Sequence, residues 1–134
     1  MTKKIKRLPD TELEVMLVIW DAEGPVSRPY LDEKLKDKGW AITTINTYLS
    51  RLLEKGFLDC ERQGRGKGRV NLYTPRIGEE EYLDCESWSF LEKLCGNSVK
   101  NFVASIARNQ AMEESEIEEL QQYLDELKRG DPNA

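Results

Sequence analysis

The sequence contains no histidine and only three cysteines among its 134 residues. Without histidine the chain cannot build a Ser-His-Asp or Cys-His nucleophile system, and it lacks the commonest general base near neutral pH. Cys60, Cys85 and Cys95 form neither a Cys-x-x-Cys nor a Cys-x-Cys pair. We therefore predict no metal site and no cofactor, and we expect reduced cysteines rather than a disulfide framework. Carboxylate, lysine and cysteine chemistry stay open, but no pattern marks such a site, so we expect a binding protein and not an enzyme.

Long apolar runs are also missing. No stretch approaches the roughly 20 apolar residues that a membrane-spanning helix needs. The basic start, MTKKIKRLPD, is not followed by the apolar segment of a signal peptide. We expect a cytoplasmic chain with no membrane partner.

Charge is unevenly distributed along the chain. The total is 20 Lys and Arg against 25 Asp and Glu, a net charge of -5. Residues 1–76 carry 15 basic and 11 acidic side chains, a net of +4, whereas residues 77–134 carry 5 and 14, a net of -9. Pro75 and Gly78 flank the change and are typical of a hinge. This asymmetry predicts two domains, a basic binding domain at 1–76 and an acidic partner domain at 77–134.

The first half has the element order of a winged helix-turn-helix. A helix is expected at about 10–23, with Asp10 as its N-cap and an apolar stripe. A second helix follows Ser27 and stops at Gly39, and a third covers about 43–55. Two short strands then flank a glycine-rich basic turn, which predicts a β-hairpin. The expected stripe of the first helix is Leu13, Met16, Leu17 and Trp20.

The second half predicts three more helices, at about 79–95, 98–109 and 114–128. Their apolar stripes are narrow, and three such short helices make a poor core alone. We expect a helical dimerisation domain in which a second copy covers these stripes. The alternative is that the helices fold back on the winged helix of the same chain. The expected interface residues are Phe90, Leu94, Val99, Phe102, Ile106, Ile117, Leu120, Leu124 and Leu127.

The third helix has two distinct faces when its residues are placed at 100° intervals. The expected buried stripe consists of Ile42, Ile45, Leu49, Leu52 and Leu53. The expected nucleic-acid-binding residues on the remaining surface are Thr43, Thr44, Asn46, Thr47, Tyr48 and Arg51. Hydroxyls, methyl groups and a cation suit contact with base edges in a major groove, and Asn46 could pair with adenine through both atoms of its amide. The alternative is a solvated, threonine-rich surface.

The glycine-rich turn of the hairpin carries Arg65, Lys67 and Arg69. Cations on such a tip suit contact with phosphates or a minor groove. Trp40, just before the third helix, is expected to pack rather than to stack on a base. The function that these features favour is binding of double-stranded DNA, and the alternative is a winged helix that docks a protein partner.

Three segments carry a resemblance to a known family. The runs LPDTELEVMLVIWDAEGPVS, WAITTINTYLSRLLEKGFL and SFLEKLCGNSVKNFVASI resemble the penicillinase repressors of the BlaI/MecI type, a family that includes the copper-responsive CopY-type repressors. The most specific matches are Glu14-Val15-Met16 with Trp20, Trp40 with Thr44 and Thr47, Arg51-Leu52 with Lys55-Gly56, and Ser89-Phe90-Leu91.

The resemblance implies a homodimeric transcriptional repressor that binds an inverted-repeat operator upstream of antibiotic resistance genes. In the antibiotic-responsive branch, a membrane sensor-protease system leads to cleavage of the repressor at an Asn-Phe bond. This sequence has Asn101-Phe102 at the matching place. The alternative is that Phe102 belongs to the apolar stripe and has no other role.

The sequence departs from the family in two places. Ala41-Ile42-Thr43 stands where the family often has Ser-Pro-Lys, and Asn46 stands where it has a basic residue. Fewer cations therefore face DNA from the third helix, so the operator sequence is left open. The chain ends in LKRGDPNA without a Cys-x-Cys motif, so copper sensing is not expected.

Overall fold

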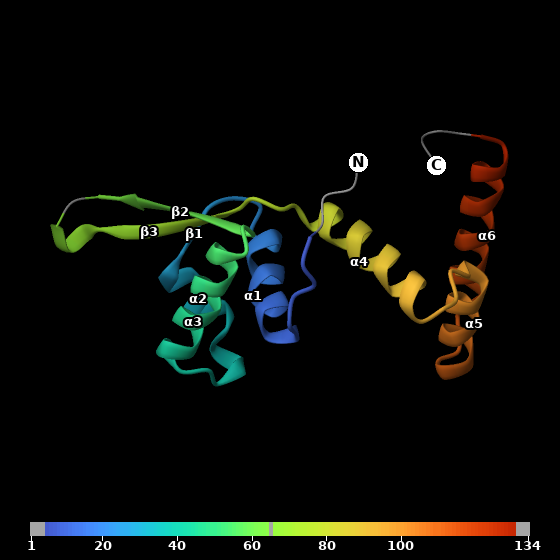
Figure 1. The fold of residues 1–134 in the computed structure, drawn as a ribbon, viewed down its shortest axis with the longest axis horizontal. Coiled ribbons are helices and arrows are strands. Elements are labelled where there is room, and N and C mark those ends of the chain that lie inside the picture. Colours follow the sequence, from blue (N-terminus) through green and yellow to red (C-terminus); the bar gives the residue numbers. More distant parts are fainter. Residues whose placement is uncertain (1–4, 65, 131–134) are drawn as a thin grey trace. The chain divides into compact units, whose positions relative to one another are not determined.

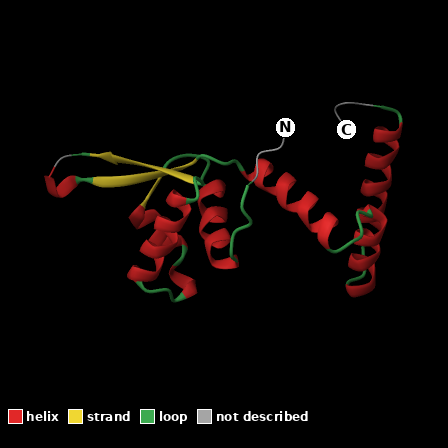
Figure 2. Cartoon of the chain, viewed as in Figure 1, coloured by secondary structure: helices red, strands yellow, loops and turns green. Residues whose placement is uncertain are grey.

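The computed structural model describes residues 5–64 and 66–130. The chain divides into two compact units, one ending at Ser87 and the other beginning at Trp88. The fold is mainly helical with one small sheet, as the sequence predicts (Figures 1 and 2).

The first unit contains the three expected helices α1 (Asp10–Asp21), α2 (Arg28–Lys34) and α3 (Ile42–Glu54), with a 3-10 turn at Lys36–Lys38. Ser27 is the N-cap of α2, as predicted, because its Oγ accepts a hydrogen bond from the Tyr30 N–H at 3.3 Å. The predicted N-cap of α1 is wrong. Pro9 occupies that position, and Asp10 is the first helical residue, where its carboxylate favours the positive end of the helix dipole.

The hairpin is also confirmed, with β2 at Leu58–Gln63 and β3 at Val70–Pro75. A third strand, β1 (Val26–Ser27), pairs with β3, so that the antiparallel order is β1-β3-β2. The sequence did not indicate β1, because two residues are too few to show an alternating pattern. Helices α1, α2 and α3 lie on one side of the hairpin, and the hairpin tip extends beyond them (Figure 1).

The core of the first unit lies between these helices and the sheet, around Met16, Leu31 and Phe57. Two expected buried positions are wrong. Leu17 is 44% exposed, because α1 turns Val15 and Ile19 inward instead. Ile42 is 69% exposed, because it is the first residue of α3 and follows an exposed loop residue, so no neighbouring turn covers it.

Helix α4 (Glu79–Lys93) begins in the first unit. The ring of Tyr82 lies 5.7 Å from the rings of both Trp20 and Phe57, and its hydroxyl accepts a hydrogen bond from the Leu8 N–H at 2.9 Å. The sequence-based boundary after Arg76 therefore falls inside this unit. Composition changes there, but Tyr82 packs with the winged helix.

The second unit consists of the end of α4 with α5 (Val99–Asn109) and α6 (Glu114–Lys128). The rings of Phe90 and Phe102 meet edge to face at 5.4 Å and join α4 to α5. No side chain among the described residues 88–130 is buried. Among all described residues, no helix is long and apolar enough to cross a membrane.

Candidate nucleic-acid interface

Helix α3 presents a polar face to solvent. Ile45, Leu49 and Leu52 anchor the opposite face in the core. The candidate residues Thr43, Asn46, Thr47 and Arg51 are exposed, whereas Thr44 and Tyr48 are half-buried. The Thr47 hydroxyl donates to the Thr43 carbonyl oxygen at 3.0 Å, so Thr47 offers its methyl group and an acceptor lone pair outward.

Tyr48 is held by Trp40. Their ring centroids lie 5.1 Å apart with the planes at 77°, an edge-to-face contact. Trp40 is thus a packing residue, as predicted. This contact fixes the aromatic ring of Tyr48 midway along α3.

Arg28, at the first position of α2, was missed by the sequence reasoning. Its Nε lies 3.0 Å from Oδ1 of Asp32, its Nη1 contacts Oδ1 of Asn46, and its Nη2 donates to the Ile42 carbonyl oxygen at 3.0 Å. One guanidinium therefore joins α2 to the first turns of α3. A signal was present: an arginine next to the helix cap of a helix-turn-helix, with Asp32 four residues later.

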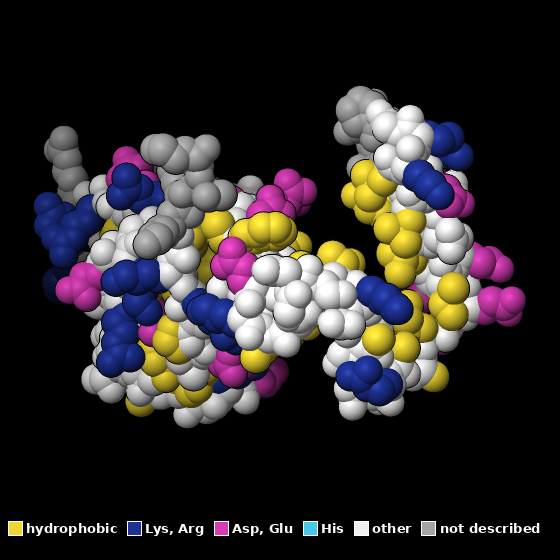
Figure 3. Space-filling model, turned by 45° about the vertical axis from the view of Figure 1, so that its right-hand side comes forward, with side chains coloured by type: hydrophobic (Ala, Val, Ile, Leu, Met, Phe, Trp, Pro, Cys, Tyr) yellow, Lys and Arg dark blue, Asp and Glu magenta, His cyan; other side chains and the backbone are white. Residues whose placement is uncertain are grey.

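The tip of the hairpin is basic and glycine-dependent. Gly64 has φ +93°, and a Cβ there would lie 2.4 Å from the Gly68 carbonyl oxygen, so no other residue fits without a shift. Lys67 lies exposed in the 3-10 turn Gly66–Gly68, whereas Arg65 lies outside the described residues. Lys and Arg side chains gather at this end of the hairpin (Figure 3).

A cleft of about 450 Å³ lies between the start of α2 and the hairpin, lined in part by Arg28, Arg62, Arg69 and Asn71. Arg62 and Asn71 are paired across β2 and β3, and Arg69 is two residues before Asn71. Residues directly opposite each other across a strand pair share a face, so Arg62 and Asn71 lie on one face of the hairpin, and Arg69 lines the same cleft. In the described part of the chain, neither Arg62 nor Arg69 has an ion-pair partner. The cleft is thus a site of uncompensated positive charge, and Arg62 is a second residue that the sequence reasoning missed.

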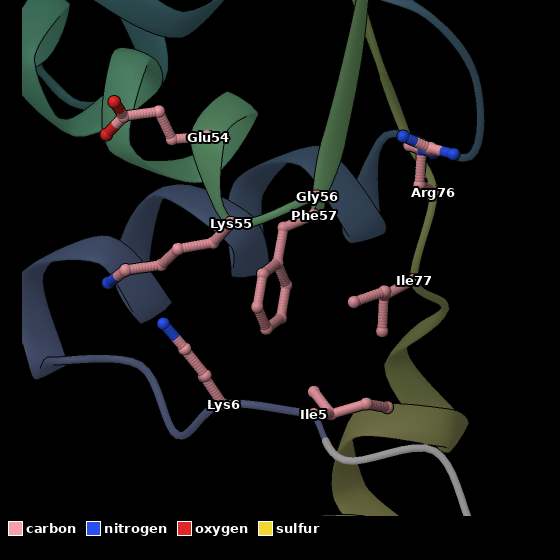
Figure 4. A pocket seen from close by; sticks show the side chains of 8 residues that line it. All are labelled: Ile5, Lys6, Glu54, Lys55, Gly56, Phe57, Arg76 and Ile77. Carbon is pink, nitrogen blue, oxygen red and sulfur yellow. The ribbon is translucent and has the colours of Figure 1, made fainter.

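Another cavity, of about 470 Å³, lies beside the turn after α3 (Figure 4). Phe57 and Ile77 form part of its apolar wall. Two of its cations are already paired: Lys55 Nζ lies 2.6 Å from Oε1 of Glu12, and Arg76 Nε lies 3.6 Å from Oδ1 of Asp59. The lysines and arginine that line this cavity therefore provide less unpaired positive charge for an anionic ligand than their number suggests.

The expected interface residues of the second unit form exposed apolar surface, together with half-buried Phe90 and Leu120. Leu94 is 71% exposed, Val99 60% and Ile117 51%. The other exposed members are Phe102, Ile106, Leu124 and Leu127.

The Asn101-Phe102 bond lies in the first turn of α5. The Asn101 N–H donates to Oγ of Ser98 at 3.1 Å, and its side-chain Nδ2 donates to the Cys95 carbonyl oxygen at 3.3 Å. Asn101 thus takes part in the start of α5, which gives it a structural role that its exposure alone did not suggest.

Across residues 5–64 and 66–130, no group of three His, Cys, Asp or Glu side chains is placed to hold a metal ion.

Comparison with known proteins gives consistent matches. The family model described as penicillinase repressor matches residues 8–126. The chain is 37% identical to a penicillinase repressor of Bacillus licheniformis, over 94% of this chain and 95% of that protein. It is 25% identical to the methicillin resistance regulatory protein MecI of Staphylococcus aureus strain N315, over 92% and 98%. The solved structure of monomeric B. licheniformis BlaI in complex with the blaP half-operator matches with a TM-score of 0.50 and 39% identity, over 60% of this chain and 94% of that chain.

Proposed function

Because the chain belongs to the penicillinase repressor family, we propose that it is a transcriptional repressor that binds operator DNA through its winged helix. The family consists of transcriptional repressors, which are not enzymes. The observation that carries the proposal is the exposed polar face of α3, together with a cleft lined by Arg62 and Arg69, which have no ion-pair partner among the described residues. The BlaI structure that this chain resembles contains a half-operator, which supports the same assignment.

In this proposal α3 enters a major groove. Thr43, Thr44 and Thr47 contact base edges with their hydroxyl and methyl groups, and Arg51 binds a base or a phosphate near the end of the helix. Tyr48 limits how closely the middle of α3 approaches the DNA, because Trp40 holds its ring.

The hairpin binds the DNA backbone. Lys67 at the tip reaches a minor groove or its phosphates, as the sequence also predicts for Arg65, and Arg62 and Arg69 hold a backbone phosphate in the cleft. These contacts orient the protein on the duplex and carry little sequence information. The cleft supplies cations that the face of α3 lacks, since Asn46 and Thr43 are neutral.

We further propose that the second unit forms a homodimer on an inverted-repeat operator. The described residues 88–130 bury no side chain within one chain, and a second copy would remove their apolar stripe from water at about 25 cal/mol per Å². Two linked winged helices would then read half-sites about one helical turn, or 34–36 Å, apart. Linking the half-sites raises affinity through effective concentration.

Cleavage between Asn101 and Phe102 would release the DNA. The bond lies in a helical turn, so a protease must first open that turn and break the hydrogen bonds of Asn101 with Ser98 and Cys95. After cleavage, Phe102 and the rest of α5 and α6 would no longer be linked to α4, and the dimer would dissociate. The expected partner is a membrane sensor-protease system.

The test is binding to duplex DNA over a salt series. A repressor binds mixed-sequence duplex at low salt, with log K falling linearly with log salt, and binds one selected inverted repeat much more tightly. Absence of any DNA affinity at low salt would refute the proposal and favour a winged helix that docks a protein.

A further inference from the structure

The Arg28 guanidinium uses all three of its nitrogens within the protein. It bonds Asp32, Asn46 and the Ile42 carbonyl oxygen, and its side chain is only 21% exposed. Arg28 is therefore a positioning residue, because each of its three nitrogens already donates one hydrogen bond within the protein and Asp32 balances its charge. Arg28 lies between α2 and α3, and its exposed partner Asn46 is the side chain that a ligand can reach.

The contact with Arg28 determines which way the Asn46 amide points. A guanidinium carries only donors, so the atom of Asn46 that it touches must be the amide oxygen. The amide nitrogen lies on the other side of the same planar group. Since Asn46 is exposed, its NH₂ group is fully available to a ligand and only donates, whereas one of the two lone pairs of its oxygen is already engaged by a charged donor.

We propose, resting on the proposed DNA-binding function, that Arg28 orients the NH₂ group of Asn46 outward as its main ligand-binding group and that the pair thereby selects guanine at one position of each half-site. In a major groove guanine presents two acceptors, N7 and O6, whereas adenine presents one acceptor and one donor. The adenine contact expected from the sequence needs the amide oxygen as well as the nitrogen. That oxygen already accepts a charge-assisted bond from Arg28, so it is a weaker acceptor for adenine N6 and adenine loses its advantage over guanine.

The experiment begins with selection of binding sites from a random duplex library by the wild-type protein. The selected site is then varied one base pair at a time, and relative affinities are measured for four variants. Asn46→Ala identifies the contacted base pair by loss of preference there. Arg28→Ala removes the constraint, Asn46→Asp replaces the outward donor with an acceptor, and Arg7→Ala is the matched control for loss of one arginine, since Arg7 pairs with Glu86 at 3.0 Å elsewhere.

We expect the wild type to favour guanine over adenine about tenfold at that base pair. Arg28→Ala should lower this ratio to near one or reverse it, because the released oxygen can accept from adenine N6. Asn46→Asp keeps the partner of Arg28 but should favour cytosine or adenine, whose amino groups donate. Arg7→Ala should leave the ratio unchanged.

The proposal is overturned if Arg28→Ala weakens all sequences equally, if Asn46→Asp still selects guanine, or if Asn46→Ala changes no base preference. Thermal unfolding of each variant checks that it folds, and if Arg28→Ala does not fold, the two Asn46 variants carry the test. A wild-type protein that selects no sequence would instead refute the proposed function itself. The two failures are therefore distinguishable.

Discussion

The Glu12 carboxylate lies 2.6 Å from Nζ of Lys55 and joins α1 to the end of α3. Glu12 is 1% exposed and is the one buried charged residue in the described part of the chain. Nη1 of Arg51 lies 4.0 Å from its other oxygen. The C-terminal end of α3 is thus held by a buried acid with two cations around it.

This geometry predicts unequal costs for the two partners. Lys55→Met should lower the free energy of unfolding by about 3 kcal/mol, because it leaves a buried carboxylate with only the distant Arg51. Glu12→Gln should cost less, about 1–2 kcal/mol, since Lys55 is 24% exposed on its own and can turn to water. Urea unfolding measures both.

An exposed ion pair that also involves a glutamate of α1 provides the control. Glu14 and Lys38 lie 3.0 Å apart with both side chains about two-fifths exposed. Glu14→Gln should change stability by less than about 1 kcal/mol, as exposed ion pairs do. A Lys55→Met variant as stable as Glu14→Gln would contradict the interpretation of Glu12 as a fixed anchor.

Tyr82 predicts a loss of stability in alkali. Burial and then its hydrogen bond with Glu86 raise the pKa of the Tyr82 hydroxyl from 10.0 to about 12. A raised folded-state pKa stabilises the fold fully below pH 10, and this contribution is lost as the pH rises from about 10 to about 12. The full difference corresponds to about 2.7 kcal/mol, as an upper bound.

Tyr82→Phe should abolish that part of the alkaline slope. At neutral pH it should also cost about 1–3 kcal/mol, because the buried Leu8 N–H loses its acceptor. Unfolding curves at pH 8 and at pH 11 measure both effects. Tyr123→Phe, on the exposed surface of α6, is the control and should leave the slope unchanged. Equal slopes for wild type and Tyr82→Phe would contradict the assignment.

The elements of the winged helix were predictable because each has a strong local signal. Ser27 and Gly39 bound α2 and its 3-10 turn, and the glycine-rich tip separates two β-type runs. What local patterns could not predict depends on tertiary contacts. The inward face of α1 is set by the sheet and α3, so that Leu17 is exposed, and the end of the first unit is set by Tyr82 rather than by charge.

The candidate site was predictable in its location but not in its chemistry. Angular spacing identified the polar face of α3 correctly as exposed at Thr43, Asn46, Thr47 and Arg51. It could not indicate that Arg28 occupies the Asn46 oxygen, because those residues lie 18 positions apart. The cleft of Arg62 and Arg69 was hidden for the same reason, since it needs the start of α2 beside the hairpin.

Arg62 should contribute to affinity without contributing to specificity. Arg62→Ala should weaken binding to the operator and to unrelated duplex by the same factor. If it contacts one phosphate, the magnitude of the slope of log K against log salt should fall by about 0.9. Arg108→Ala, with the same charge change on α5, should leave the slope unchanged. A loss confined to the operator would show that Arg62 reads bases instead.

The apolar stripe of α6 should control assembly. Leu120→Lys combined with Leu124→Lys places two charges on the surface that a second copy is expected to cover, so the protein should sediment as a monomer. Glu118→Lys with Gln122→Lys puts the same spacing on the opposite face, because a two-residue shift turns the helix by about 200°. That control should remain dimeric.

A dimeric mass for the leucine variant would contradict the dimer assignment, and a wild-type monomer would favour folding of these helices onto their own winged helix. The leucine variant should still bind a single half-site, since its α3 is unchanged, but it should lose the gain in affinity that a full inverted repeat gives to two linked winged helices.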